Sequence, residues 1–310
     1  KDYNDENPSI DIRGEAEIDP KGVGEVYDYG SNIESPEEGQ ILAKIRAEEI
    51  ACHKKVYFGE GMVARMLPGF TFEVVNHFKK DINQAYQLLS ITHEGHEPSL
   101  LSGEATDSAA YRNNFTAIAA NVQYRPEKDT PKPQFYGTME AFIDAEGDGE
   151  YAEIDATGRY KVVLPFDRTL RQESKASCWV RMQQPYAGES EGMHFPLRKG
   201  AEVLLTFIGG DPDRPVISGA VPNHAKPSVV TDTNQTKNVI QTSKGNKIEI
   251  EDRDDCKRIK LHSPHKNTYM HLGAPNHAGD GWVVITEGME RKEIGGGQQL
   301  TVLAQPTQDG

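Results

Sequence analysis

Apolar and polar side chains alternate along most of the chain, a pattern typical of strands that bury one face. The alternation is clear from Phe70 to Val74 and again from Val203 to Phe207. The 29 glycines and 18 prolines divide the sequence into short runs between turns. We therefore predict a mainly β fold.

One segment has the pattern of a helix instead. Ser35 supplies an N-cap, Pro36 suits the first helical position, and Glu38 completes a capping box. Apolar residues then follow at helical spacing: Ile41, Leu42, Ile45 and Ala51. The sequence predicts one helix, over residues 36–53.

A proline-rich connector at residues 125–133 precedes five strand-like runs, and a second connector follows at residues 222–228. Five short strands in about 85 residues suit a small Greek-key barrel such as an OB-fold. The predicted strands are Tyr136–Ile143, Gly158–Pro165, Ser177–Gln184, Glu202–Ile208 and Pro215–Val221.

The last part of the chain, after residue 228, consists of short predicted strands at close intervals, with few large apolar side chains. Such a segment cannot bury enough surface alone to offset its chain entropy. Either its strands fold back on the barrel, or identical chains wind together into a symmetric oligomer. The predicted strands are Val239–Thr242, Lys247–Glu251, Arg258–Ser263, Thr268–Leu272, Trp282–Thr286 and Gln299–Leu303.

Charge is distributed unevenly along the chain. Of the formal net charge of -14, residues 1–150 carry 28 acidic against 14 basic side chains, whereas residues 151–310 carry 20 of each. A polyanion would be repelled by the first half, which argues against a nucleic-acid reader. Mean hydropathy is -0.65, and no apolar run reaches the roughly 18–20 residues that a membrane span needs. Three widely spaced cysteines argue against a disulfide scaffold.

Four histidines in the tail, His262, His265, His271 and His277, are the candidates for a metal site. No carboxylate or thiol stands at ligand spacing beside them, so we favour exposed or strand-packing histidines and predict no metal. Residues 251–255 crowd four carboxylates into a predicted hairpin turn without a calcium-loop pattern. Neither a nucleophile elbow nor a phosphate cradle is evident, so we predict no catalytic residue and no cofactor.

Cross-strand ion pairs are expected in the tail. Lys257, Arg258 and Lys260 in one run face Glu249, Glu251 and Asp252 in the run before it. We expect these pairs on the outside of the structure, where each contributes on the order of 0.2–1 kcal/mol.

A second group of candidates is structural and lies in the predicted barrel. We expect a tight turn between its fourth and fifth strands, in which proline fixes φ and aspartates accept hydrogen bonds from backbone amides. We also expect Trp179 and Phe207 to pack in the core or between subunits. The turn residues are Gly209, Asp211, Pro212, Asp213, Arg214 and Pro215.

Several of these segments resemble the VgrG family, the spike proteins of bacterial type VI secretion. Residues 160–167 are YKVVLPFD, residues 177–181 are SCWVR, and residues 209–219 are GGDPDRPVISG. Residues 111–118, YRNNFTAI, resemble the end of the family's hub domain, and residues 242–252, TSKGNKIEIED, resemble the first strands of its spike. These landmarks occur in the family's order between about residues 34 and 263.

The resemblance implies a homotrimer similar to the hub and spike of contractile phage tails. It implies that residues 1–133 are the later part of a hub-like β-barrel domain, 134–222 an OB-fold spike base, and 223–310 the start of an intertwined triple-stranded β-helix. The implied partners are an Hcp-like tube protein at the hub end, a PAAR-like tip protein at the spike end, effectors, chaperones and baseplate proteins. Assembly in the bacterial cytoplasm and translocation to the extracellular space or a target cell would follow, with only transient contact with the target membrane.

Other interpretations remain at this point. The chain opens without an initiator Met or an apolar leader, so we expect a truncated or processed form of a longer protein. A phage tail or extracellular injection-system spike is the alternative in the same class, and a carbohydrate- or nucleic-acid-binding OB-fold module is one in another class. A peptidoglycan hydrolase is a third, but the stretch from Val221 to Lys247 is too short for an inserted enzyme domain. We also expect the acidic first half of the chain to present an acidic surface at the hub end.

Overall fold

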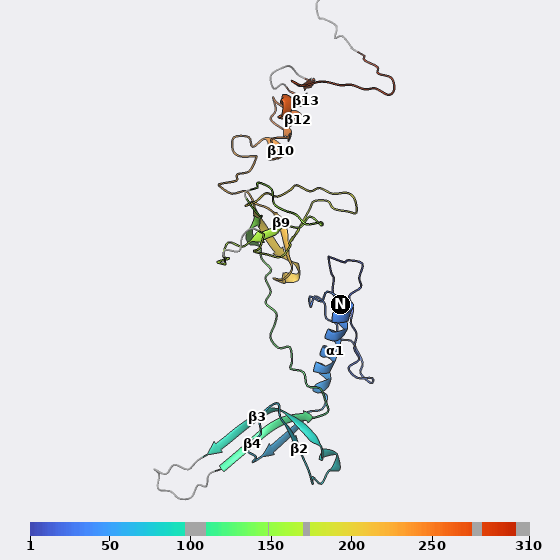
Figure 1. Cartoon of the computed structure of the whole chain (residues 1–310), viewed down its shortest axis with the longest axis vertical. Helices are drawn as coiled ribbons and strands as arrows, with labels where there is room; N and C mark the ends of the chain where they lie inside the picture. Colours follow the sequence, from blue (N-terminus) through green and yellow to red (C-terminus); the bar gives the residue numbers. More distant parts are fainter. Residues whose placement is uncertain (97–109, 148, 170–173, 275–280, 302–310) are drawn as a thin grey trace, which may run out of the picture. The chain divides into compact units, whose positions relative to one another are not determined.

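The computed structural model describes residues 1–310 except 97–109, 148, 170–173, 275–280 and 302–310. The chain divides into two compact units, Lys1–Gln134 and Phe135–Gly310 (Figure 1). One α-helix and fourteen strands occur in the described residues, which confirms the prediction of a mainly β chain with a single helix. No helix in the described part of the chain combines the length and the apolar character that a membrane crossing requires.

The helix α1, Pro36–Cys52, begins as the sequence predicts and ends one residue earlier. Ser35 Oγ accepts a hydrogen bond from the Glu38 amide at 3.2 Å, and Glu38 Oε2 accepts one from the Glu34 amide at 2.9 Å. These two bonds satisfy amides that lack partners at a helix start, so local sequence alone defines this end of the helix.

The first unit also holds a four-stranded antiparallel sheet in the order β1-β4-β3-β2. Its core is aromatic: the rings of Tyr57 and Tyr86 lie 4.8 Å apart, and Phe72 meets Phe115 edge to face at 5.3 Å. Gly59 leaves the space that the Phe115 ring fills, since a Cβ there would lie 2.2 Å from that ring. The elements are β1 Tyr57–Gly61, β2 Thr71–Glu73, the short helix η1 Lys80–Ile82, β3 Ala85–His96 and β4 Ala110–Ala119.

The second unit opens with a five-stranded sheet in the order β6-β5-β8-β9-β7, closed by a parallel pair between β7 and β9. All five predicted barrel strands are present, although β6 and β7 are shorter than predicted. Alternate side chains from these strands form a buried core that includes Ile143, Tyr160, Val203 and Ile217. The elements are β5 Met139–Asp144, β6 Lys161–Val163, β7 Arg181–Met182, β8 Glu202–Phe207, η2 Ile208–Gly210 and β9 Pro215–Ala220.

The C-terminal sheet follows, with five antiparallel strands in chain order from β10 to β14. The first five predicted tail strands occur within two residues of their predicted bounds. Residues 299–301 are not in a strand, so that part of the sixth prediction is wrong, and residues 302–303 lie outside the described residues. The elements are β10 Lys237–Gln241, β11 Lys247–Glu251, β12 Arg258–Ser263, η3 His265–Asn267, β13 Thr268–Gly273 and β14 Gly281–Ile285.

An ion pair joins the barrel to the C-terminal sheet. Glu150 lies in the connection between β5 and β6 of the barrel and accepts hydrogen bonds from Arg198 of the barrel and, at 3.1 Å, from Lys244 in the β10–β11 turn. Both contacts lower the pKa of the Glu150 carboxyl, that from Lys244 most.

Candidate functional site

One face of the C-terminal sheet is apolar across all five strands. The register places Ile240 opposite Ile248, Ile248 opposite Leu261, and Leu261 opposite Met270. The exposed apolar side chains of this face range from 40% exposed at Ile250 to 75% exposed at Trp282. A contiguous exposed apolar face of this kind marks an interaction surface rather than an ordinary protein exterior. The other apolar residues of this face are Ile259, Leu272 and Val284, and the polar Asn238 lies at its edge opposite Ile250.

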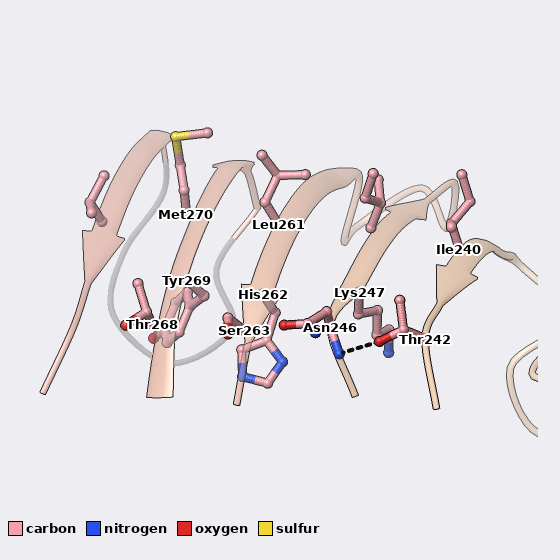
Figure 2. A pocket seen from close by; sticks show the side chains of 12 residues that line it. Ile240, Thr242, Asn246, Lys247, Leu261, His262, Ser263, Thr268, Tyr269 and Met270 are labelled. Atoms are coloured by element: carbon pink, nitrogen blue, oxygen red, sulfur yellow. Dashed lines mark hydrogen bonds between the residues drawn. The ribbon is translucent and has the colours of Figure 1, made fainter. Parts of the chain in front are cut away.

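A groove of about 500 Å³ lies at this sheet. Figure 2 shows Met270, Leu261 and Ile240 on one side of the strands and Tyr269 and His262 on the other. The two sets alternate along the strands, because successive side chains of a strand point to opposite faces of the sheet. The apolar face therefore belongs to the sheet as a whole and not to one strand.

The opposite face is polar and centres on the Glu249 carboxylate. Although Glu249 is only 4% exposed, its oxygens contact Lys247 at 2.5 Å, Arg258 at 2.9 Å and Lys237 at 3.2 Å. Burial alone would raise the pKa of Glu249, but the hydrogen bonds from these three cations outweigh it and hold the pKa at about 2. The carboxylate thus ties β10, β11 and β12 together.

This network corrects the expected pattern of exposed ion pairs. Glu249 lies directly opposite Lys260 and Glu251 opposite Arg258, yet the pair that forms is the diagonal one between Arg258 and Glu249. The two side chains are only 8% and 5% exposed, so the pair is buried. Lys257 instead pairs with Asp254 within the β11–β12 turn, at 3.0 Å. The expectation was wrong because sequence spacing does not reveal that long side chains bury one another on this face.

Lys260 and His271 lie side by side on the polar face, and neither forms an ion pair with a carboxylate among the described residues. They are opposite each other in the β12–β13 register. Lys260 Nζ lies 4.3 Å from the centre of the Tyr269 ring, and the His271 ring stacks beside the same tyrosine at 6.2 Å. His271 is 1% exposed, and neither of its ring nitrogens has a hydrogen-bond partner among the described residues. Unpartnered polar atoms at this depth are uncommon and call for a physical explanation.

The four candidate histidines do not converge. His262 lies on β12 with its ring edge toward Tyr269, His265 is exposed in η3, and His271 is buried on β13. His277 lies outside the described residues. Among the residues that the structure describes, no three His, Cys, Asp or Glu side chains are grouped so as to hold a metal ion. The prediction that no metal is bound stays a prediction.

The candidate turn of the barrel joins β8 to β9. Gly209 and Gly210 adopt positive φ values of 63° and 76°. The Arg214 amide donates to the Asp211 carbonyl at 3.0 Å, and Asp211 Oδ1 accepts from the Asp213 amide at 3.0 Å. Pro212 lies within the turn, and Pro215 begins β9. The segment reverses the chain over a few residues and brings β8 and β9 into antiparallel register.

The two candidate aromatic residues of the barrel are both half-buried. Phe207 packs against the barrel core and meets Phe135 edge to face at 5.3 Å. Trp179 lies beneath the Lys161 ammonium, which is 4.9 Å from its ring centre. A role for either ring between subunits stays a prediction.

Sequence reasoning missed a polar network inside the barrel. The buried Tyr160 hydroxyl accepts a hydrogen bond from the Leu197 amide at 3.1 Å and lies 3.0 Å from His194 Nε2. Gln184 contacts the other ring nitrogen of His194 at 2.9 Å. Burial raises the pKa of the Tyr160 hydroxyl. No short motif links these residues, because the contacts join positions up to 37 apart in the chain.

Two family models match the chain in the order of its domains. Residues 1–99 match the phage tail baseplate hub (GPD), and residues 152–221 match the type VI secretion system/phage-baseplate injector OB domain. The second match covers most of the barrel, so the predicted OB-fold is confirmed.

Curated proteins match over most of the chain. The type VI secretion system spike protein VgrG4b of Pseudomonas aeruginosa is 30% identical over 283 residues, which are 85% of this chain and 35% of that protein. The actin cross-linking toxin VgrG1 of Vibrio cholerae is 30% identical over 245 residues, 76% of this chain and 22% of that protein. The chain therefore spans about a third or less of the length of these relatives.

Solved structures show a similar fold. The VgrG-containing complex titled "Structure of Francisella PdpA-VgrG Complex, half-lidded" aligns with a TM-score of 0.50 at 8% identity, covering 75% of this chain and 41% of that one. The predicted resemblance is thus confirmed, and the chain is a relative of the VgrG spike proteins of type VI secretion systems.

Proposed function

We propose that the protein is a structural spike component of a contractile injection apparatus of the type VI class, and that it acts as a homotrimer. The observation that carries this proposal is the apolar face of β10–β14, which the described residues leave exposed. The relatives named as type VI spike proteins support the same function over most of the chain.

A trimer gives the apolar face a partner. Three copies of the sheet, each with its apolar face inward, would form a closed prism whose interior is dry and whose polar faces point outward. Closure would also pair or cover the sheet edges at β10 and β14, which would otherwise be open to aggregation. An intertwined triple-stranded β-helix over residues 223–310 is the form that we propose for this prism.

The remaining segments take the roles of a hub and a spike base. We propose that residues 1–133 are the later part of the hub and that residues 134–222 are the OB-fold base. An Hcp-like tube protein would bind at the hub end, where the chain is most acidic, and a PAAR-like tip protein at the spike end. Effectors, chaperones and baseplate proteins would complete the assembly, which forms in the cytoplasm before translocation.

We propose a mechanical and not an enzymatic role for this stretch of chain. VgrG4b of Pseudomonas aeruginosa is named as a spike protein, and VgrG1 of Vibrio cholerae, which is named as a toxin, is much longer than the part that matches here. The rigidity of such a spike would come from continuous backbone hydrogen bonding across the sheets. The target membrane would be contacted only transiently, during translocation.

The alternatives have less support. A phage tail spike shares the hub model, but the curated relatives that match most of the chain are type VI proteins. A nucleic-acid-binding OB-fold would require an excess of basic residues that a chain of net charge -14 does not have. Nothing specific in the structure favours a carbohydrate site.

Light scattering on the purified 310-residue chain tests the proposal. We expect a mass near three times 34.4 kDa at micromolar concentration. Leu261→Lys places a charge on the apolar face and should reduce this mass, whereas Met289→Lys changes an apolar residue that is 87% exposed after β14 and should not. A monomeric parent chain, or a trimer that tolerates Leu261→Lys, would contradict the proposal.

A further inference from the structure

The polar face of the C-terminal sheet carries more positive than negative charge, although the chain as a whole has a net charge of -14. Period-two alternation places four cations and two carboxylates on this face: Lys237, Lys247, Arg258 and Lys260, with Glu249 and Glu251. Three of the cations already share the single Glu249 carboxylate. The surplus of positive charge is therefore local, and it is concentrated around Lys260.

Lys260 lies opposite Glu249 in the β11–β12 register but does not form an ion pair with it, unlike the other three cations. Within the described residues, no carboxylate lies at ion-pair distance from its Nζ, which instead sits 4.3 Å from the Tyr269 ring centre. Burial, and then the neighbouring Arg258 charge, lower the pKa of the Lys260 ammonium, and the opposing effect of the Glu249 charge is smaller. A half-buried ammonium among like charges is costly unless an anion compensates it.

His271 supplies a second, independent observation. Its imidazole is 1% exposed, and both ring nitrogens lack a hydrogen-bond partner in the described part of the chain. A neutral imidazole carries one N–H donor, and leaving that donor buried and unmet costs about 1–3 kcal/mol. His271 lies opposite Lys260, and both contact the Tyr269 ring. One ligand between them would satisfy both groups.

We propose that Lys260 and His271 form a binding site for a small tetrahedral oxyanion of the phosphate class. The Lys260 side chain would change rotamer, so that its ammonium leaves the Tyr269 ring and contacts the anion. This movement would also give the anion access to the imidazole N–H of His271. A planar carboxylate is better matched by an arginine fork, but the Arg258 guanidinium on this face is engaged with Glu249. The lysine and imidazole donors would come from two adjacent strands, β12 and β13, which suits an anion with oxygens on several sides.

Calorimetric titration of the full 310-residue chain with inorganic phosphate tests the site, with ionic strength held constant by sodium chloride. We expect saturable binding that weakens at least tenfold in Lys260→Gln. Lys257→Gln is the matched control, because Lys257 is 66% exposed in the adjoining turn and pairs with Asp254. This control should bind phosphate as the parent chain does. Circular dichroism and light scattering on each variant verify that the fold and the mass are unchanged.

His271→Phe separates a ligand role from a packing role. The phenyl ring keeps the buried volume and removes both nitrogens, so the free energy of unfolding should be maintained or increased while phosphate affinity falls. A parallel titration with sodium acetate tests whether the site prefers a tetrahedral anion to a planar carboxylate. Absence of saturable phosphate binding, equal affinity in Lys260→Gln or His271→Phe, or an equal response to acetate would each overturn the assignment.

Discussion

Replacing Glu249 with glutamine removes the one carboxylate that three cations share, and it keeps the size of the side chain. The pKa of Glu249 lies at about 2 instead of its ordinary 4.5, which corresponds to roughly 3 kcal/mol of folding free energy at about 1.36 kcal/mol per pKa unit. Removing one partner of a buried ion pair typically costs about 3–5 kcal/mol, because the other charge remains buried. In Glu249→Gln, the Arg258 guanidinium, whose side chain is 8% exposed, would remain buried without this carboxylate. We expect Glu249→Gln to lose about 3 kcal/mol of unfolding free energy at pH 7.

The pH dependence gives this prediction a definite sign. Because the folded-state pKa of Glu249 is depressed, its stabilisation is complete above the ordinary pKa of 4.5 and is lost as the pH falls toward about 2. The stabilities of the parent and of Glu249→Gln should therefore converge through this window, while they differ by a constant amount from pH 6 to pH 8.

Urea unfolding, followed by tryptophan fluorescence, measures this difference. The chain has two tryptophans, so a Trp179→Phe background leaves Trp282 on β14 as the reporter of the C-terminal sheet. Asp254→Asn is the control, since Asp254 is 99% exposed and its pair with Lys257 should contribute at most about 1 kcal/mol. A loss below about 0.5 kcal/mol for Glu249→Gln at pH 7, or a difference at pH 2 as large as the difference at pH 7, would refute the reasoning.

Two further substitutions test the first unit and the barrel. Tyr160→Phe leaves the Leu197 amide and the His194 ring without the buried hydroxyl, so thermal unfolding should reveal a loss of about 1–3 kcal/mol, whereas Tyr151→Phe at a 54% exposed ring should change little. Gly59→Ala would place a Cβ 2.2 Å from the Phe115 ring and should cost about 1–3 kcal/mol, whereas Gly95→Ala in the same sheet meets no atom within 4 Å. Equal stabilities within either pair would contradict the packing that the structure shows.

Strands and the helix could be predicted because their signals are local. The alternation of apolar and polar residues between turn signals predicted every barrel strand. Ser35, Pro36 and Glu38 predicted the first residue of α1. The segment at residues 299–301 shows the limit of this approach. It has a strand-like composition, but in the described residues it has no neighbouring strand with which to pair, and composition alone does not supply one.

The candidate site depended on contacts that sequence spacing does not encode. The parallel pair of β7 with β9 and the Tyr160–His194 contact join distant positions. Glu249 and His271 are buried on a face where the period-two pattern predicts exposed polar side chains, and three cations converge on Glu249. The pattern predicted which face each residue occupies; it did not predict how deeply the residue is buried on that face.

The two faces of the C-terminal sheet specify its register together. Because side-chain direction alternates with every residue, a slip of one position would move Glu249 to the apolar face and bring Ile248 and Ile250 among the lysines. Such a slip would separate a buried carboxylate from three cations, at a cost similar to that expected for Glu249→Gln. The polar network is formed within one chain, whereas the apolar face would be covered by the other copies of the proposed trimer. The polar network therefore helps to specify the register within each chain, so Glu249→Gln should weaken both the sheet and the proposed assembly, whereas Leu261→Lys should act mainly on the assembly.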